Sequence, residues 1–505
     1  MGVLKKLASE TALYGVSTIL GRLFNYVLVP IHTSLFLPSQ LAVQVELYAY
    51  AGVAFTIYTY GMETTYFRFA NSSDNKQNYY NLIQSAIITS SLVMSGLLIL
   101  LATPLTELMG FSGERTVFVW MAVIMATDAI VAIPFARLRL EKQAKRFVAA
   151  KLVNIGLNVG LNFFFLYFCR DVNSGKYLSE IKPLVDTFYR PEIAPRYIVL
   201  ANLVANLVFF WMLRRQFTHF KFVFNAQLFK PVWRYAYPIL IMSLAGVTNM
   251  MSDRMFLRYL LPEGFYLGRT SEDALGIYGN CYKLSIFMNL AIQAFKYAAE
   301  PFFFSKAEDK NAPLLFARVM QWFIIVCIVI WLAVSLNLDL LGLILRRPIY
   351  REGLAVVPIL LLAFLFLGIY YNLTTWFKLT NKTRYGTFIT LAGATCNVLL
   401  NFLLVPQLGY MGSALTFMFS SFLMVALCYW LGQKYYPVPY NVASAVFYVL
   451  SAGLLIYLAY PIKSANFWLS FTYHSALLGL YFLVILVIER DAIPLKIKQK
   501  IKILG

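Results

Sequence analysis

The sequence predicts an all-α integral membrane protein with fourteen transmembrane helices, built as two pseudo-symmetric six-helix lobes and a C-terminal helix pair. Three observations lead to this prediction: the composition, the number of apolar stretches and an internal repeat. Of the 505 residues, 60% are hydrophobic and 13% are charged, whereas a soluble protein carries about 25% charged residues. The main solvent expected for this chain is therefore the lipid bilayer.

Fourteen stretches are candidates for helices that cross a bilayer, which takes about 20 mostly apolar residues. The eighth contains Pro301, which we expect to kink or end that helix. The candidate spans are 11–36, 43–66, 80–103, 116–138, 147–168, 196–213, 232–260, 274–304, 314–335, 353–377, 385–405, 411–432, 443–460 and 465–488.

An internal repeat divides the chain. Residues 158–163 read Asn-Val-Gly-Leu-Asn-Phe and residues 397–402 read Asn-Val-Leu-Leu-Asn-Phe. The copies fall in spans five and eleven, so the shift is an even number of spans and both halves run in the same direction through the membrane. We therefore predict lobes at 1–225 and 226–435, followed by the last two spans and a basic tail at 436–505.

The distribution of basic residues predicts the orientation. Segments on the side of the N-terminus hold 27 of the 43 Lys and Arg residues, and segments on the opposite side hold 12. Because cytoplasmic loops carry the excess of Lys and Arg, both termini are expected in the cytoplasm. The loop 170–195 is then external, either as a small folded cap or as a flexible connector.

Nine charged residues fall inside the predicted spans when the basic residues at span ends, such as Arg258, are counted with the adjoining loops. Each costs about 2.5–3.5 kcal/mol at the centre of a lipid-facing helix, so we expect them to line a wet cavity, to pair, or to lie near the membrane surface. The nine are Arg22, Glu46, Glu63, Asp128, Asp253, Arg254, Lys283, Lys296 and Glu300.

The cations among these nine predict an anionic substrate. Arg and Lys in a membrane cavity suit phosphate above all, so Arg22, Arg254, Lys283 and Lys296 are candidate substrate-binding residues. Lys296 and Glu300 are four residues apart and alternatively neutralise each other. Asp253 and Arg254 are adjacent, about 100° apart on a helix, and are not expected to face one cavity together.

The acidic residues inside the spans are candidates for ion coupling or for lining the cavity. No GxxxxGK[ST] motif occurs, so uphill transport would use a gradient such as H⁺ or Na⁺, the membrane potential, or removal of product. Asp253 alternatively pairs with another helix. Glu46, Glu63 and the cation Lys283 lie within two or three turns of span ends and alternatively reach the membrane surface. The candidates are Glu46, Glu63, Asp128, Asp253 and Glu300.

The asparagines of the repeat form a stripe on each helix. Asn158 and Asn162 belong to the first copy, and Asn397 and Asn401 to the second. Their amides either bond neighbouring helices or contact sugar hydroxyls; the first alternative is the ordinary role of such residues in membranes.

Motifs of other functional classes are missing from the sequence. It contains no GxSxG or HExxH motif and no CxxC pair, and its three histidines are scattered. We therefore expect no enzyme, no catalytic residue, no metal site and no cofactor. The net charge of +20 lies in short loops between spans, so a nucleic-acid partner is not expected. The five cysteines lie in apolar stretches and are expected to be small buried residues.

The chain resembles the multidrug/oligosaccharidyl-lipid/polysaccharide (MOP) exporter superfamily, and most of all its bacterial polysaccharide flippases of the Wzx type. The resemblance rests on the order of spans and on short segments: Gly21-Arg22-Leu23, Leu37-Pro38, Asp253-Arg254, Gly276-Ile277-Tyr278 and Ala299-Glu300-Pro301. It implies a V-shaped pair of lobes in the bacterial inner membrane that move undecaprenyl-pyrophosphate-linked oligosaccharides to the periplasmic leaflet by alternating access. It further implies that Arg22 and Arg254 meet the pyrophosphate, and that spans 443–488 help form a lipid-facing groove.

Three transport functions remain open. The first is a flippase for O-antigen, capsule or exopolysaccharide units, with polysaccharide polymerase or assembly proteins as possible partners. The second is a flippase for lipid II, the peptidoglycan precursor. The third is a cation-coupled multidrug exporter, a class that usually has twelve spans. A membrane-embedded polymerase or glycosyltransferase would need a catalytic external loop, and 170–195 carries no clear motif.

Overall fold

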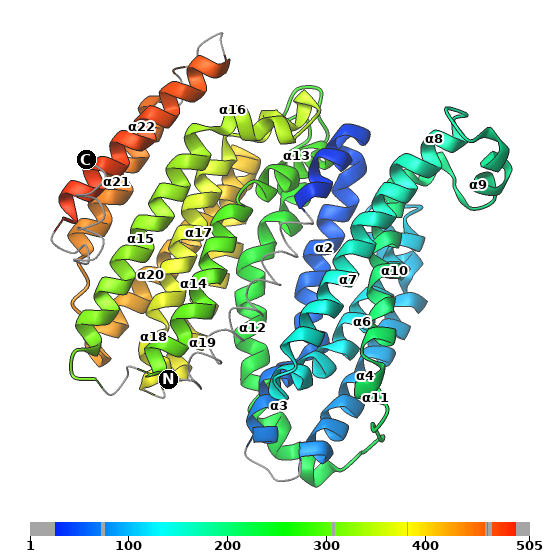
Figure 1. The fold of residues 1–505 in the computed structure, drawn as a ribbon, viewed down its shortest axis with the longest axis horizontal. Helices are drawn as coiled ribbons and strands as arrows, with labels where there is room; N and C mark the ends of the chain where they lie inside the picture. Colours follow the sequence, from blue (N-terminus) through cyan, green and yellow to red (C-terminus); the bar gives the residue numbers. More distant parts are fainter. Residues whose placement is uncertain are drawn as a thin grey trace.

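The computed structural model describes residues 26–71, 76–305, 309–380, 382–459, 462 and 467–490, and every regular element in these ranges is helical (Figure 1). Within them, eleven helices are long and apolar enough to cross a membrane. The protein is thus a multi-pass membrane protein. The predicted total of fourteen spans includes residues outside these ranges and stays a prediction.

The described helices follow the predicted spans. Eleven candidates match predicted spans two to six and nine to fourteen. A shorter apolar helix, Tyr26–Leu35, lies in predicted span one, and α12 (Ala226–Leu260) lies in span seven. Predicted span eight is two helices, α13 (Ser271–Lys283) and α14 (Ile286–Ser305).

The break between α13 and α14 differs from the expected break at Pro301, which lies near the end of α14. At the observed break, the Ser285 hydroxyl donates to the Tyr282 carbonyl at 2.6 Å. Such side-chain bonds compete with the helical backbone pattern. The interruption therefore lies directly after Lys283, one of the predicted substrate-binding cations.

One bundle of helices forms the right half of Figure 1. In it, α6 contacts α2, α3, α4, α7 and α10. The members of this first bundle are α2 (Pro38–Thr59), α3 (Met62–Asn71), α4 (Lys76–Leu100), α5 (Ala102–Leu108), α6 (Arg115–Leu140), α7 (Ala144–Phe163), α10 (Tyr197–Met212) and α11 (Arg214–Phe217).

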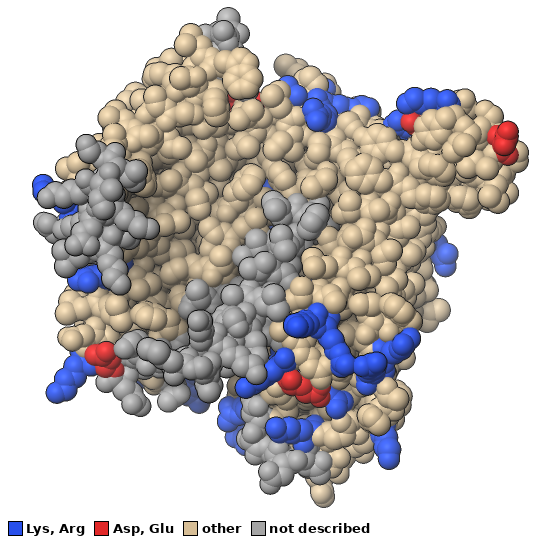
Figure 2. Space-filling model, in the orientation of Figure 1, with Lys and Arg blue, Asp and Glu red and all other residues tan. Residues whose placement is uncertain are grey.

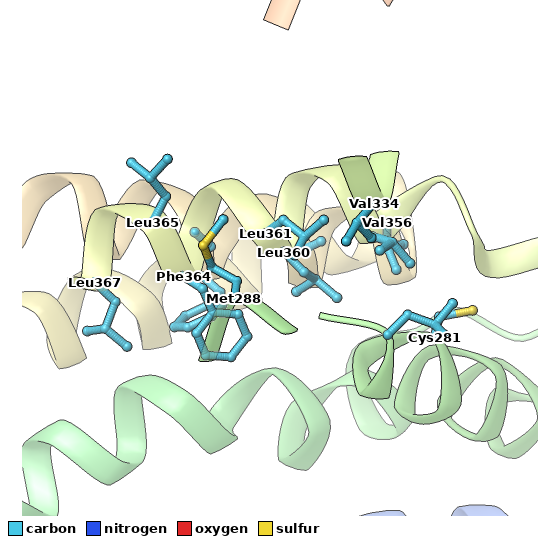
Figure 3. Packing of buried hydrophobic residues seen from close by; sticks show 14 of the residues in the cluster. Cys281, Met288, Val334, Val356, Leu360, Leu361, Phe364, Leu365 and Leu367 are labelled. Atoms are coloured by element: carbon cyan, nitrogen blue, oxygen red, sulfur yellow. The ribbon is translucent and has the colours of Figure 1, made fainter. Parts of the chain in front are cut away.

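A second bundle forms the left half of Figure 1, with α21 and α22 on its outer side. Its centre is α17, whose Leu360, Leu361 and Phe364 pack near Met288 and Cys281 (Figure 3). Its members are α12, α13, α14, α15 (Ala312–Leu336), α17 (Val356–Leu373), α18 (Thr375–Leu379), α19 (Thr383–Leu408) and α20 (Tyr410–Tyr435), flanked by α21 (Val442–Ala459) and α22 (Phe467–Ile488).

Buried positions agree with the apolar pattern of the sequence. Cys169, Cys281, Cys327 and Cys428 are buried and Cys396 is half-buried, as the sequence predicts. The loop that follows α7 is folded rather than extended: it contains the short helices α8 (Arg170–Asn173) and α9 (Lys182–Phe188). The Asn173 amide donates to Asp186 at 2.7 Å between them. This favours the cap over the flexible connector.

The two bundles meet where α2 contacts α12 and α13. Two glycines of α13 allow this contact. A Cβ at Gly276 would lie 2.0 Å from the Pro38 carbonyl oxygen, and a Cβ at Gly279 would lie 2.6 Å from the Val45 side chain. The bundles therefore touch backbone to backbone along this contact, which we call the α2–α13 seam.

Candidate functional site at the junction of the bundles

Helix α12 brings charged side chains to the junction. It begins at Asn225, whose side chain accepts a hydrogen bond from the Leu228 N–H at 3.1 Å, an N-cap of the usual kind. It continues for 35 residues and carries Asp253, Arg254 and Arg258 near its end. Because Arg254 and Arg258 are four residues apart, they share one face of the helix.

Asp253 and Arg254 form one polar cluster with two tyrosines of α13. Asp253 is buried and accepts from the Tyr278 hydroxyl at 2.6 Å. Arg254 Nε lies 3.3 Å from Asp253 Oδ1, and its guanidinium lies 4.0 Å from the centre of the Tyr282 ring. The long arginine side chain folds back onto the carboxylate of its neighbour, so the two side chains are in contact. The alternative that Asp253 joins another helix is correct.

Lys283 follows Tyr282 directly, so a second cation lies at the end of α13, one residue after the ring that Arg254 contacts. Its Nζ donates to Asn280 Oδ1 at 3.0 Å, and the residue is half-buried. The described carboxylates lie beyond salt-bridge distance from it. With Asp253 offsetting Arg254, the cluster keeps a net positive charge.

Glu46 is fully buried on α2. Its Oε2 lies 3.2 Å from Arg258 Nη1, and its Oε1 accepts from the Tyr259 hydroxyl at 2.7 Å. Arg258 also donates to the Met109 carbonyl, and its guanidinium lies 4.0 Å from the Phe111 ring centre. This Glu46–Arg258 pair therefore joins the two bundles across the α2–α12 contact.

Arg258 and Tyr259 are the partners that reasoning from the sequence missed. Both lie in the last turn of predicted span seven, where Arg258 was grouped with the basic residues of the following loop. Arg258 could have been identified from its four-residue spacing from Arg254, which places both arginines on one face of a long helix.

Asp128 lies inside the first bundle and away from the charged corner of α12 and α13. Its Oδ1 accepts from the Asn206 amide at 3.0 Å, and Asn206 Oδ1 accepts from the Asn154 amide at 2.9 Å. The network joins α6, α10 and α7. Lys151 lies nearby on α7, with its Nζ 4.4 Å from the Phe135 ring centre. The contacts of Asp128 are those of a residue that bonds helices together.

The other predicted site residues lie elsewhere. Glu63 is half-exposed and pairs with Arg139 at the end of α6. Lys296 is exposed, and its Nζ lies 4.7 Å from the Tyr371 ring centre, between α14 and α17. Arg22 and the side chain of Glu300 lie outside the described part of the structure, so the Lys296–Glu300 alternative stays open.

The two asparagine stripes have the same internal geometry. In the first copy, the Asn162 amide donates to the Asn158 carbonyl at 2.8 Å; in the second, the Asn401 amide donates to the Asn397 carbonyl at 3.0 Å. Each copy also bonds the helix four predicted spans earlier, which is span one for the first copy and span seven for the second. His32 Nε2 lies 2.9 Å from Asn162 Oδ1, and Ser252 donates to Asn397. These contacts support the interhelical role.

Solved structures of a lipid II flippase and of multidrug resistance transporters have a similar fold. One is a lipid II flippase, MurJ, in an inward closed conformation, with a TM-score of 0.70 and 12% identity over 95% of this chain and 100% of that one. Another is an inward-facing multidrug resistance MATE transporter of the MOP superfamily. Its TM-score is 0.62, and the sequences are 14% identical over 82% of this chain and 94% of that one. An outward-facing MATE transporter of the MOP superfamily has a TM-score of 0.55 and is 15% identical over 85% of this chain and 94% of that one.

The chain therefore has the fold of MOP-superfamily transporters. No family model and no curated protein matches the sequence, so the fold and the positions of single residues carry the functional argument.

Proposed function

We propose that the protein is a flippase that moves undecaprenyl-pyrophosphate-linked oligosaccharides from the cytoplasmic to the periplasmic leaflet of the bacterial inner membrane, for O-antigen, capsule or exopolysaccharide synthesis. The observation that carries the proposal is the cationic corner formed by Arg254 and Lys283 in a MOP fold. A pyrophosphate is the part of such a substrate that needs cations in a poorly hydrated place.

The proposed site combines charges with different tasks. Arg254 and Lys283 bind the pyrophosphate, and Arg22 and Lys296 complete the binding residues. Asp253 orients Arg254 through the contact described above. Arg254 Nη2 also donates to the Met250 carbonyl. Because a guanidinium carries five N–H donors, its Nη1 group is the one that we assign to the phosphate.

An apolar groove supports a lipid-linked substrate. It has a volume of about 520 Å³ and is lined almost wholly by apolar side chains of α15, α17, α20 and α21. A polyprenyl chain needs such a surface, and α21, the first helix of the C-terminal pair, provides one wall. The groove lies on the second bundle, on the face of α17 that carries Phe366, Ile369 and Leu373.

The junction of the bundles supports alternating access. The lobes 1–225 and 226–435 are the proposed moving bodies, with both termini in the cytoplasm and 436–505 attached to the second lobe. The α2–α13 seam and the Glu46–Arg258 pair close the periplasmic side, which agrees with the higher TM-score to the inward-facing than to the outward-facing MATE structure. The acids Glu46, Asp128 and Glu300 stay candidates for H⁺ or Na⁺ coupling.

A lipid II flippase is the second candidate, because the MurJ structure is covered over its whole length by this chain. Both substrates present a pyrophosphate and a polyprenyl chain, so the geometry of the cationic corner serves either. A cation-coupled multidrug exporter is the third, and the buried arginine pairs argue against it because they do not match a cationic drug.

Complementation separates the three candidates. The gene is expressed in one strain that lacks its polysaccharide flippase and one that lacks its lipid II flippase, and drug resistance is measured in parallel. We expect surface polysaccharide to return in the first strain, and Arg254→Ala and Arg22→Ala to abolish it while the protein stays in the membrane. Arg269→Ala is the matched control, because Arg269 is half-exposed on the loop after α12 and pairs with Glu352.

Normal polysaccharide in both Arg254→Ala and Arg22→Ala would contradict the role of these cations. Rescue of only the second strain would assign lipid II as the substrate. Drug resistance without rescue of either strain would contradict both flippase functions.

A further inference from the structure

A small pocket on the outer side of the first bundle combines arginines with apolar side chains. It has a volume of about 210 Å³ and lies where the end of α6, the start of α7 and the turn between α10 and α11 come together. Leu138 and Leu213 form a buried floor, and three exposed arginines surround it: Arg146, Arg214 and Arg215.

Local structure holds the arginines at the pocket. Helix α10 ends at Met212, and Leu213 leaves the helical conformation, so that α11 turns Arg214 and Arg215 toward the start of α7. Arg146 Nη1 donates to Gln143 Oε1 at 2.7 Å. The Arg214 guanidinium lies 5.5 Å from the Trp211 ring centre.

The charge of this pocket is not balanced by the described carboxylates. The acid closest in sequence, Glu141, accepts from Arg137 at 2.6 Å and from Gln143 at 2.7 Å. The three pocket arginines form no ion pair within the ranges that the structure describes. Figure 2 shows further Lys and Arg side chains at the end of the molecule that carries α3 and α11. The pocket is therefore strongly cationic.

The position of the pocket is that of a membrane surface. Helices α7 and α10 are both membrane-span candidates, and the pocket lies where α10 ends and α7 begins. Trp211 is 62% exposed at that end, and exposed tryptophans mark the headgroup level of the bilayer. A ligand there has hydrocarbon on one side and water on the other.

We propose that this pocket binds the headgroup of an anionic glycerophospholipid from the leaflet that faces α11. The phosphodiester accepts hydrogen bonds from Arg214 and Arg215, with Arg146 on the opposite rim. The apolar floor and Trp211 take the glycerol and the first part of an acyl chain. Basic pockets between transmembrane helices bind anionic headgroups in this way. The site is separate from the cationic corner at Arg254 and Lys283, and it does not depend on the proposed substrate.

Lipid titration followed by native mass spectrometry tests the site on the purified full chain. Phosphatidylglycerol is compared with phosphatidylcholine and with inorganic phosphate. Each arginine near a headgroup contributes about fivefold in affinity, so Arg214→Gln with Arg215→Gln should raise the apparent Kd for phosphatidylglycerol about 25-fold. The matched control is Lys145→Gln with Lys221→Gln, which removes two exposed cations near the same end without touching the pocket, and it should change Kd less than about threefold.

The pair Arg214→Lys with Arg215→Lys keeps the charge and should retain most of the binding, which covers the case in which the glutamine variants fold poorly. Equal loss of affinity in the pocket and control variants would overturn the proposal, because general surface charge would then explain binding. Equal binding of phosphatidylcholine, or full competition by inorganic phosphate at similar concentration, would also overturn it.

Discussion

Glu46 and Glu63 were predicted from the same feature, an acid inside an apolar span, and the structure gives each of them an arginine partner. Glu46 is 0% exposed and its partner Arg258 is 9% exposed, and they join α2 of one bundle to α12 of the other. Glu63 is 42% exposed and its partner Arg139 is 33% exposed, and both belong to the first bundle. A glutamate–arginine pair thus occurs once as a buried contact between the bundles and once as a partly exposed contact within the first bundle.

The difference in exposure indicates which of the two ion pairs holds the bundles together. A pair exposed to water contributes about 0–1 kcal/mol, whereas removing one member of a buried pair costs about 3–5 kcal/mol because a charge is left without a partner. Movement of the bundles would separate Glu46 from Arg258 but leave Glu63 and Arg139 together. Only the first pair is therefore expected to respond to the conformation of the protein.

Arg258→Ala should produce the largest effect. Glu46 would stay buried with only the Tyr259 hydroxyl, so the closed state should lose about 3–5 kcal/mol. The measurement is the midpoint of thermal unfolding in detergent, together with the accessibility of a cysteine placed at Val45. An unchanged midpoint and an unreactive cysteine would show that the pair does not hold the bundles together.

Gly276→Ala should open the α2–α13 seam. The added Cβ would meet the Pro38 carbonyl, a backbone atom that cannot rotate away, at a cost of about 3 kcal/mol. Spin labels on α2 and α13 should report a longer distance. The control is Gly156→Ala on α7, where a Cβ has nothing within 4 Å; it should leave the distance unchanged, and an equal shift in both variants would refute the role of the seam.

Asn397→Ala should destabilise more than Asn158→Ala, although the two asparagines occupy the same place in the repeat. Asn397 is fully buried and exchanges hydrogen bonds with Asn249, Ser252, Ser420 and Asn401. At about 0.6 kcal/mol for each bond, its loss should cost about 2 kcal/mol. Asn158 is half-buried, and its loss should cost about 1 kcal/mol. Thermal midpoints of the two variants decide the order, and a reversed order would contradict it.

Glu63→Ala should have the smallest effect, about 0.5 kcal/mol. Arg139 is 33% exposed and would keep its position 5.1 Å from the Phe67 ring centre. The same unfolding assay measures it at low and high salt. A loss as large as that of Arg258→Ala would remove the distinction between the two pairs.

The sequence predicted the helices better than it predicted the partners of the charges. Apolar stretches set the helix positions because each must satisfy its own backbone in lipid, and these match eleven described helices. The pairing of Glu46 with Arg258 depends on which helices touch, and that contact is decided by small residues such as Gly276 and Gly279. Neither glycine is distinctive when apolar residues are counted along the sequence. The fold of Arg254 onto Asp253 depends on a side-chain rotamer, which spacing along the helix does not determine.

A reversible cross-link across the α2–α13 seam tests the central claim that the bundles alternate by opening there. Gln40 on α2 and Glu272 on α13 line one pocket, so cysteines at these two positions can be joined by a short thiol-specific reagent, with each single cysteine as a control. Transport is read as surface polysaccharide in the complemented strain. The account predicts that cross-linking stops transport and that reduction restores it. Transport that continues at full rate in quantitatively cross-linked protein would contradict it.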